Sequence, residues 1–152
     1  MSISVADYGS AFWLGMLVGI NTVPAQYWVA LLINDADEGY DGTVLAAVEP
    51  VLTDELLVAT GYLRRPYGVG AGSWSSTEGG FTTNTIAISY PVPTADWGIV
   101  LGWALCTSSV AGELFAFGEF DNPQYVAAGN ALIIPAGGLT LTMTGPTNTI
   151  VV

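Results

Sequence analysis

The residues best suited to chemistry are the acids of one short loop, Asp35, Asp37 and Asp41, which surround Gly39. Alternating carboxylates around a glycine are what a flexible loop needs to wrap oxygen ligands around Ca²⁺. An EF-hand would place a glutamate at the end of this loop, where Ala46 stands instead. The pattern therefore favours an acidic turn between strands. If any cofactor binds, we expect it to be calcium on these three aspartates.

The sequence lacks residue types that many other catalytic mechanisms need. The chain has no histidine and no lysine, which removes His-dependent triads, histidine metal sites, Schiff bases and P-loops. Paired carboxylates remain, as in glycoside hydrolases, with Glu113, Glu119 and Asp121 as candidates. Nothing in their spacing sets two of them across a cleft, and acids at strand ends are usually solvated. We predict no catalytic residue and no enzymatic activity.

The only cysteine, Cys106, follows the apolar stretch 99–105. A single cysteine excludes an intrachain disulfide and a cysteine metal site. A small buried thiol fits a strand of this kind, so we expect Cys106 to be an inert core residue. The glycines of 68–72 precede Ser73 and Trp74 rather than a helix pattern, and no lysine accompanies them, so they do not indicate a phosphate-binding loop.

The charge balance excludes several partners. Thirteen acids face two bases, Arg64 and Arg65, and the net charge is -11. Binding phosphates needs clustered basic residues, so we expect neither nucleic acid nor an anionic membrane surface as a partner. We expect the two arginines to pair with carboxylates, inside the fold or across a subunit contact. No apolar run is long enough to span a membrane and no basic segment starts a secretory signal, so assembly in a host cytoplasm is expected.

Apolar patterning predicts the fold. Phe12, Trp13, Met16 and Leu17 share one face of a helix predicted over 5–20. After it, apolar and alternating segments predict about eight strands, at 26–33, 60–67, 82–90, 97–107, 113–120, 125–128, 131–134 and 139–144, with a short one near Trp74. We therefore predict a mainly β chain with one domain over 1–152. Its architecture is expected to be an antiparallel β-sandwich or barrel-like sandwich with one short N-terminal helix.

A series of short motifs follows this order along the chain. It consists of Tyr27-Trp28-Val29-Ala30-Leu31-Leu32, Gly61-Tyr62-Leu63-Arg64, Thr83-Asn84-Thr85, Tyr90-Pro91, Ala95-Asp96-Trp97-Gly98, Trp103-Ala104-Leu105, Leu114-Phe115-Ala116-Phe117-Gly118, Ala127-Ala128-Gly129-Asn130 and Ile134-Pro135-Ala136-Gly137. The series resembles a family of short tailed-phage proteins usually labelled phage tail fibre proteins, over about 6–144. The resemblance implies a virion component without enzymatic activity, and it supplies no binding residues.

The expected function is that of a structural protein of the virion, which binds copies of itself and other capsid or tail subunits. The low charge and 51% hydrophobic content favour a surface partly buried against neighbours. The candidates for subunit contacts are Trp13, Met16, Arg64, Arg65, Trp74, Ile150 and Val151, the last two in an apolar tail at 145–152.

Two other functions remain open at this stage. One is a capsid decoration or cement protein that stabilises the head shell. The other is a carbohydrate- or cell-surface-binding module, in which Trp74, Trp97 and Tyr125 would stack on sugar rings.

Overall fold

The computed structural model describes residues 3–5, 14–33, 55, 60–75, 81–110, 112 and 114–142. Within these residues the chain consists of strands, turns and one short helical turn at 14–17. The strands are β1 (Ile3–Val5), β2 (Gln26–Ile33), β3 (Arg65–Gly68), β4 (Phe81–Thr83), β5 (Ile88–Ser89), β6 (Gly98–Cys106), β7 (Leu114–Val126), β8 (Ile133–Ile134) and β9 (Thr140–Thr142).

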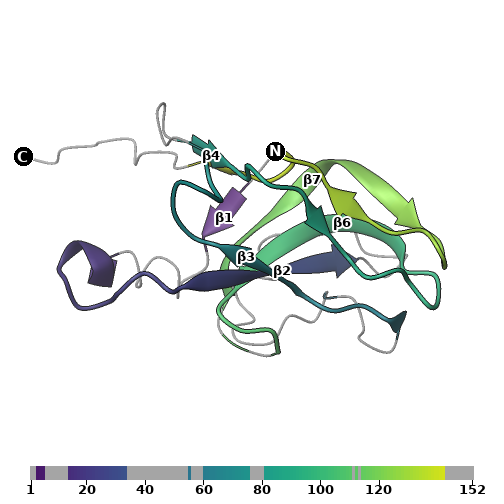
Figure 1. Ribbon diagram of the computed structural model, residues 1–152, viewed down its shortest axis with the longest axis horizontal. Coiled ribbons are helices and arrows are strands. Elements are labelled where there is room, and N and C mark those ends of the chain that lie inside the picture. The colour runs from purple at the N-terminus through teal and green to yellow at the C-terminus, as the bar shows by residue number, and fades with distance from the viewer. Residues whose placement is uncertain are drawn as a thin grey trace, which may run out of the picture.

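Five strands form the main sheet, in the order β1-β7-β6-β2-β3, with every neighbouring pair antiparallel (Figure 1). The pairs β4–β9 and β5–β8 form two small antiparallel sheets. Ile88 and Ile134 of the β5–β8 pair join Val29 and Trp103 of the main sheet in one buried cluster. The small sheets thus make a second layer, and the described strands do not close into a barrel. The predicted mainly β, sandwich-like fold class is confirmed.

Strand β2 is buried on both of its faces. Tyr27, Val29 and Leu31 belong to the cluster beneath the small sheets, while Ala30 and Leu32 belong to a second cluster on the opposite face. A strand that is covered on both sides must be apolar at nearly every position. This explains why the uncharged run Gln26–Ile33 was predicted with the bounds that the structure has.

Strand β7 contains a large bulge against β6. Between the pairs Val100–Gln124 and Gly102–Glu119, β6 advances by two residues and β7 by five. The extra residues lie at the centre of one continuous strand, Leu114–Val126. The prediction of two separate strands, at 113–120 and 125–128, is therefore wrong. A proline has no backbone N–H to donate, so Pro123 indicated the end of a strand in the sequence. A bulge tolerates such a residue.

Two glycines allow β6 and β7 to approach each other around a large side chain. A Cβ on Gly118 would lie 3.0 Å from Cζ2 of Trp103, its cross-strand partner. A Cβ on Gly102 would lie 2.5 Å from the backbone oxygen of Gly118. The fully buried indole of Trp103 therefore occupies the space that Gly118 leaves open, while Gly102 allows the two backbones to lie close together.

The N-terminal helix is shorter than predicted. Val5 lies in β1 and pairs with Ala116, so the prediction that the helix begins at Val5 is wrong. Backbone pairing with β7 provides β1 with hydrogen bonds that a helix would otherwise make internally. The described helical turn covers 14–17. Gly19 follows it with a φ of +77°, the left-handed conformation that is common just after a helix. Residues 6–13 lie outside the described part.

Candidate functional site

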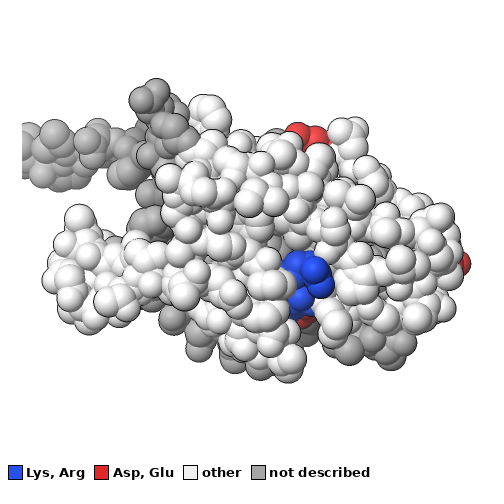
Figure 2. All heavy atoms as spheres, viewed as in Figure 1, with Lys and Arg blue, Asp and Glu red and all other residues white. Residues whose placement is uncertain are grey.

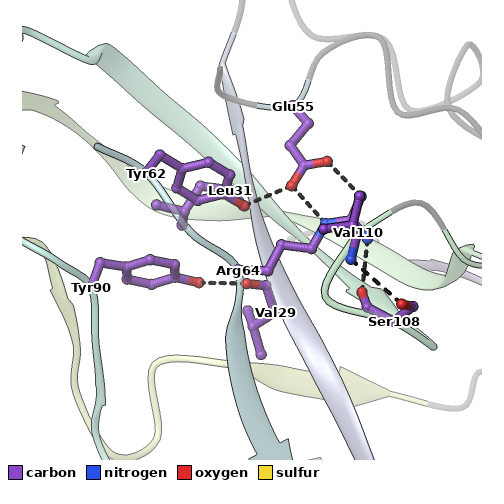
Figure 3. Close-up of polar contacts among 8 residues, drawn as sticks. All are labelled: Val29, Leu31, Glu55, Tyr62, Arg64, Tyr90, Ser108 and Val110. Carbon is purple, nitrogen blue, oxygen red and sulfur yellow. Dashed lines mark hydrogen bonds and ion pairs between the residues drawn. The ribbon is translucent and has the colours of Figure 1, made fainter. Parts of the chain in front are cut away.

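Arg64 and Glu55 form a buried ion pair beside the main sheet (Figure 3). The Arg64 guanidinium donates from Nε to Glu55 Oε1 at 2.7 Å and from Nη2 to Oε2 at 2.6 Å. Its Nη1 donates to the backbone oxygen of Ser108 at 2.9 Å. Only 6% of the Arg64 side chain and 15% of the Glu55 side chain are exposed. The prediction that Arg64 pairs with a carboxylate is confirmed, with the partner inside the fold.

Two tyrosine hydroxyls form hydrogen bonds with backbone groups of β2 near the point where β3 stops pairing with it. Strand β3 pairs with β2 only from Gln26 to Val29. Beyond that point the hydroxyl of Tyr62 accepts a hydrogen bond from the Leu31 backbone N–H at 2.9 Å. The hydroxyl of Tyr90 donates to the backbone oxygen of Val29 at 3.1 Å. Side chains therefore take the place of a strand and satisfy backbone groups that burial would otherwise leave unpaired.

The same network connects to the ion pair, because the Tyr62 hydroxyl donates to Glu55 Oε1 at 2.8 Å. Burial and the nearby Glu55 charge raise the pKa of Tyr62 far above its ordinary value. Burial also raises the pKa of Tyr90. For Arg64, burial acts to lower the pKa, but the hydrogen bond and charge of Glu55 outweigh it and the pKa rises. The arginine therefore stays charged and the tyrosines stay neutral, as expected for a buried network with a structural role.

Arg65, the other base, lies partly exposed at the start of β3. Its side chain makes no ion pair with any residue that the structure describes. Figure 2 shows the basic atoms together near the middle of one face, mostly among uncharged residues, with acidic atoms visible directly beside them. Pairing of Arg65 with a carboxylate therefore stays a prediction.

The aromatic residues proposed for sugar stacking lie in different environments. Trp97 is buried, packs edge-on against Tyr62 and donates from Nε1 to the backbone oxygen of Thr60 at 3.1 Å. Trp74 is half-buried, and its ring meets Tyr67 edge-on with centroids 5.2 Å apart. Tyr125 is exposed. Because Trp97 is buried, the three rings do not form one exposed binding surface together.

The segment 14–23, here called the arm, is the most apolar exposed part of the described chain. It lies at one end of the molecule, separated from the sheets (Figure 1). Its exposed apolar side chains are Leu14, Leu17, Val18, Ile20 and Val23, each between 57% and 83% exposed. Met16, a predicted subunit contact, is half-buried within it.

A protein-family model described as the podophage GP4 fiber I protein gp80 matches residues 5–142 of the chain. The chain belongs to this family. The resemblance to phage tail fibre proteins is thereby confirmed, and the chain is related to a structural protein of a phage fibre. None of the curated proteins compared matches it.

The match to the gp80 family covers the arm, the Arg64–Glu55 pair and all strands from β2 to β9. It ends before the apolar tail at 145–152. Trp13, Ile150 and Val151 lie outside the described residues, and so do Asp35, Asp37 and Asp41, the three aspartates weighed as calcium ligands. Their roles remain predictions.

Two of the three carboxylates considered for catalysis lie in β7 of this gp80-family chain. Glu119 is half-buried, Asp121 is exposed, and Glu113 lies outside the described residues. No three metal-ligating side chains lie together within the described ranges. None of the helices described is long and apolar enough to cross a membrane.

Burial of Cys106 agrees with its predicted role. The side chain lies in the second cluster of the main sheet and is 1% exposed. Burial raises the pKa of its thiol to about 12, with the Glu55 charge adding to this and the Arg64 charge opposing it. A thiol that remains protonated is a poor nucleophile.

The sequence did not identify Glu55 and Tyr62 as members of the buried network. Arg64 in an acidic chain predicted a carboxylate partner but not which one. No local pattern around Tyr62 or Glu55 indicates that they share this network with Arg64.

Proposed function

We propose that this chain is a non-enzymatic structural subunit of a podophage fibre, which binds copies of itself and attaches to the virion through neighbouring proteins. Membership of the gp80 family supports the fibre location. The buried Arg64–Glu55 ion pair and the burial of both faces of β2 favour a rigid subunit. The arm is the single observation that favours self-association.

The arm has the composition of a contact surface. Its five exposed apolar side chains lie within ten residues, and the chain has no charged residue from Leu14 to Ile33. Contiguous exposed apolar surface usually marks a protein–protein contact. Because the arm lies apart from the sheets (Figure 1), its side chains are placed to reach a neighbouring subunit.

Charge favours the arm over the rest of the surface as the place where copies meet. Each copy carries a net charge of -11, so two acidic faces repel each other. An uncharged segment avoids that repulsion and gains from removing apolar surface from water. The partly exposed Arg65 offers a second favourable contact to an acidic neighbour.

Sedimentation velocity over a range of protein concentrations tests this proposal. We expect the wild-type chain to form oligomers and Leu17→Asp to shift the population toward monomers, because it places a charge in the apolar contact. Val110→Asp is the matched control, since Val110 is 76% exposed but lies outside the arm. A monomeric wild type, or equal dissociation by the two variants, would contradict the proposal.

A further inference from the structure

A pocket lies beside the bulge of β7. Its volume is about 210 Å³. One wall comes from the bulge and carries Phe120, Asp121, Asn122 and Gln124, and the opposite wall comes from residues 132–138. The pocket is separate from the Arg64–Glu55 network and from the arm, and neither of those features explains it.

The bulge creates the polar wall. Glu119 and Gln124 pair with β6, but the residues between them have no counterpart there. Asp121, Asn122 and Gln124 are exposed, while Phe120 is half-buried and packs against the main core cluster. A bulge can redirect side chains in this way, and bulges are enriched beside functional sites.

The opposite wall is held in place by one buried side chain, Asn84, which is 1% exposed. Its Nδ2 donates to the backbone oxygens of Pro135 and Ile86, each at 2.9 Å, and its Oδ1 accepts from the Leu139 N–H at 2.7 Å. A turn closes between them, with the Gly138 N–H donating to the Pro135 oxygen at 2.9 Å. The wall is therefore formed before any ligand arrives, which lowers the entropic cost of binding.

The lining combines an apolar floor with neutral and acidic hydrogen-bonding groups. Val100, Leu132 and Ile134 supply apolar surface beside the Phe120 ring. Two carboxamides can donate and accept, the carboxylate of Asp121 accepts, and the hydroxyl of Thr140 does both. No arginine lines the pocket, so a phosphate, sulfate or carboxylate would find no counter-charge there. Only one carboxylate lines the pocket, which supplies little negative charge for a divalent cation.

We propose that this pocket binds one neutral sugar ring. A saccharide presents adjacent hydroxyls, which match carboxamides and a carboxylate, and apolar C–H groups, which match an aromatic ring. The size agrees, because a cavity of about 150 Å³ holds a benzene molecule and this one is larger. The ligand site uses residues that the stacking hypothesis for Trp74, Trp97 and Tyr125 did not include.

Titration of the ¹⁵N-labelled chain with neutral monosaccharides, followed by amide chemical shifts, tests the proposal. The panel is glucose, galactose, N-acetylglucosamine and rhamnose. We expect at least one of them to give saturable shifts on the amides of Asn122, Gln124, Gly137 and Gly138, with dissociation constants in the millimolar range. Asn122→Ala and Gln124→Ala should each weaken binding about tenfold through the loss of a hydrogen bond.

Asn130→Ala is the matched control, because Asn130 is an exposed asparagine outside the pocket and its loss should leave binding unchanged. Folding of each variant is checked by the dispersion of its own spectrum. Absence of saturable shifts with all four sugars would overturn the proposal. Shifts that appear with methylamine but with none of the sugars would also overturn it, in favour of a cationic ligand for Asp121.

Discussion

The guanidinium of Arg64 binds the carboxylate of Glu55 through two parallel hydrogen bonds, 2.7 Å and 2.6 Å long, in a site almost closed to water. Removing either partner leaves a buried charge without compensation. Glu55→Leu or Arg64→Leu should therefore each cost about 3–5 kcal/mol of unfolding free energy. The double variant should cost clearly less than the sum, because it leaves neither charge behind.

Denaturant unfolding of the wild type, both single variants and the double variant measures this coupling as a double-mutant cycle. Arg65→Leu serves as the control, since Arg65 is the neighbouring, partly exposed arginine without an ion pair in the described structure. We expect Arg65→Leu to change stability by less than about 0.5 kcal/mol. Strictly additive costs for Glu55→Leu and Arg64→Leu would show that the pair does not act as a unit.

Stability should fall at alkaline pH because three buried groups resist ionisation. Burial raises the pKa values of Cys106, Tyr62 and Tyr90 in the folded state. In the unfolded chain the thiol ionises near its ordinary pKa of 9.0 and the phenols near 10.0. The unfolded state thus loses protons that the folded state keeps, so the stabilisation is complete below about pH 9 and is lost as pH rises above it.

Unfolding free energies measured at intervals from about pH 8 to about pH 11 test this dependence. Cys106→Ala should move the start of the decline toward about pH 10, where only the tyrosines remain. A curve that stays level across this range, or one that Cys106→Ala leaves unshifted, would contradict the assignment.

Because β6 and β7 lie close together at Gly102 and Gly118, we expect one added methyl group at either position to lower the stability of the fold. Gly118→Ala places a Cβ 3.0 Å from the indole of Trp103, and Gly102→Ala places one 2.5 Å from a backbone oxygen. Each should destabilise the fold by about 1–3 kcal/mol through overpacking. Gly72→Ala is the control, because nothing lies within 4 Å of a Cβ there. Thermal unfolding midpoints that fall equally for the three variants would show that the strands are not tightly packed.

The strands with the clearest apolar runs were predictable from the sequence. Strand β2 has the predicted bounds and β6 nearly so, because burial on both sides leaves an unbroken apolar pattern. Strand β7 was not predictable as one strand, because Pro123 and its polar neighbours suggest a turn where the chain forms a bulge. A bulge depends on the register with β6, which no local pattern contains.

The sites were less predictable than the strands. A charge pair for Arg64 followed from composition. Its partner Glu55 could not be predicted, because it depends on a fold that pairs Glu55 with Leu32 of β2 in an isolated bridge. The pocket needs Phe120 and Gln124 on one wall and a turn fixed by Asn84 on the other. These residues lie far apart in the chain, and only tertiary structure brings them together.

We propose above that this chain is a fibre subunit of the virion. The most direct measurement is its copy number in purified particles relative to the major capsid protein, by quantitative mass spectrometry. Chymotrypsin is the suitable protease, because the chain has two basic residues and trypsin has almost nowhere to cut. We expect a low number of copies, because few fibres attach to each particle. Copies as numerous as the capsid subunits would indicate a head decoration protein instead, and absence from the particle would contradict the virion assignment altogether.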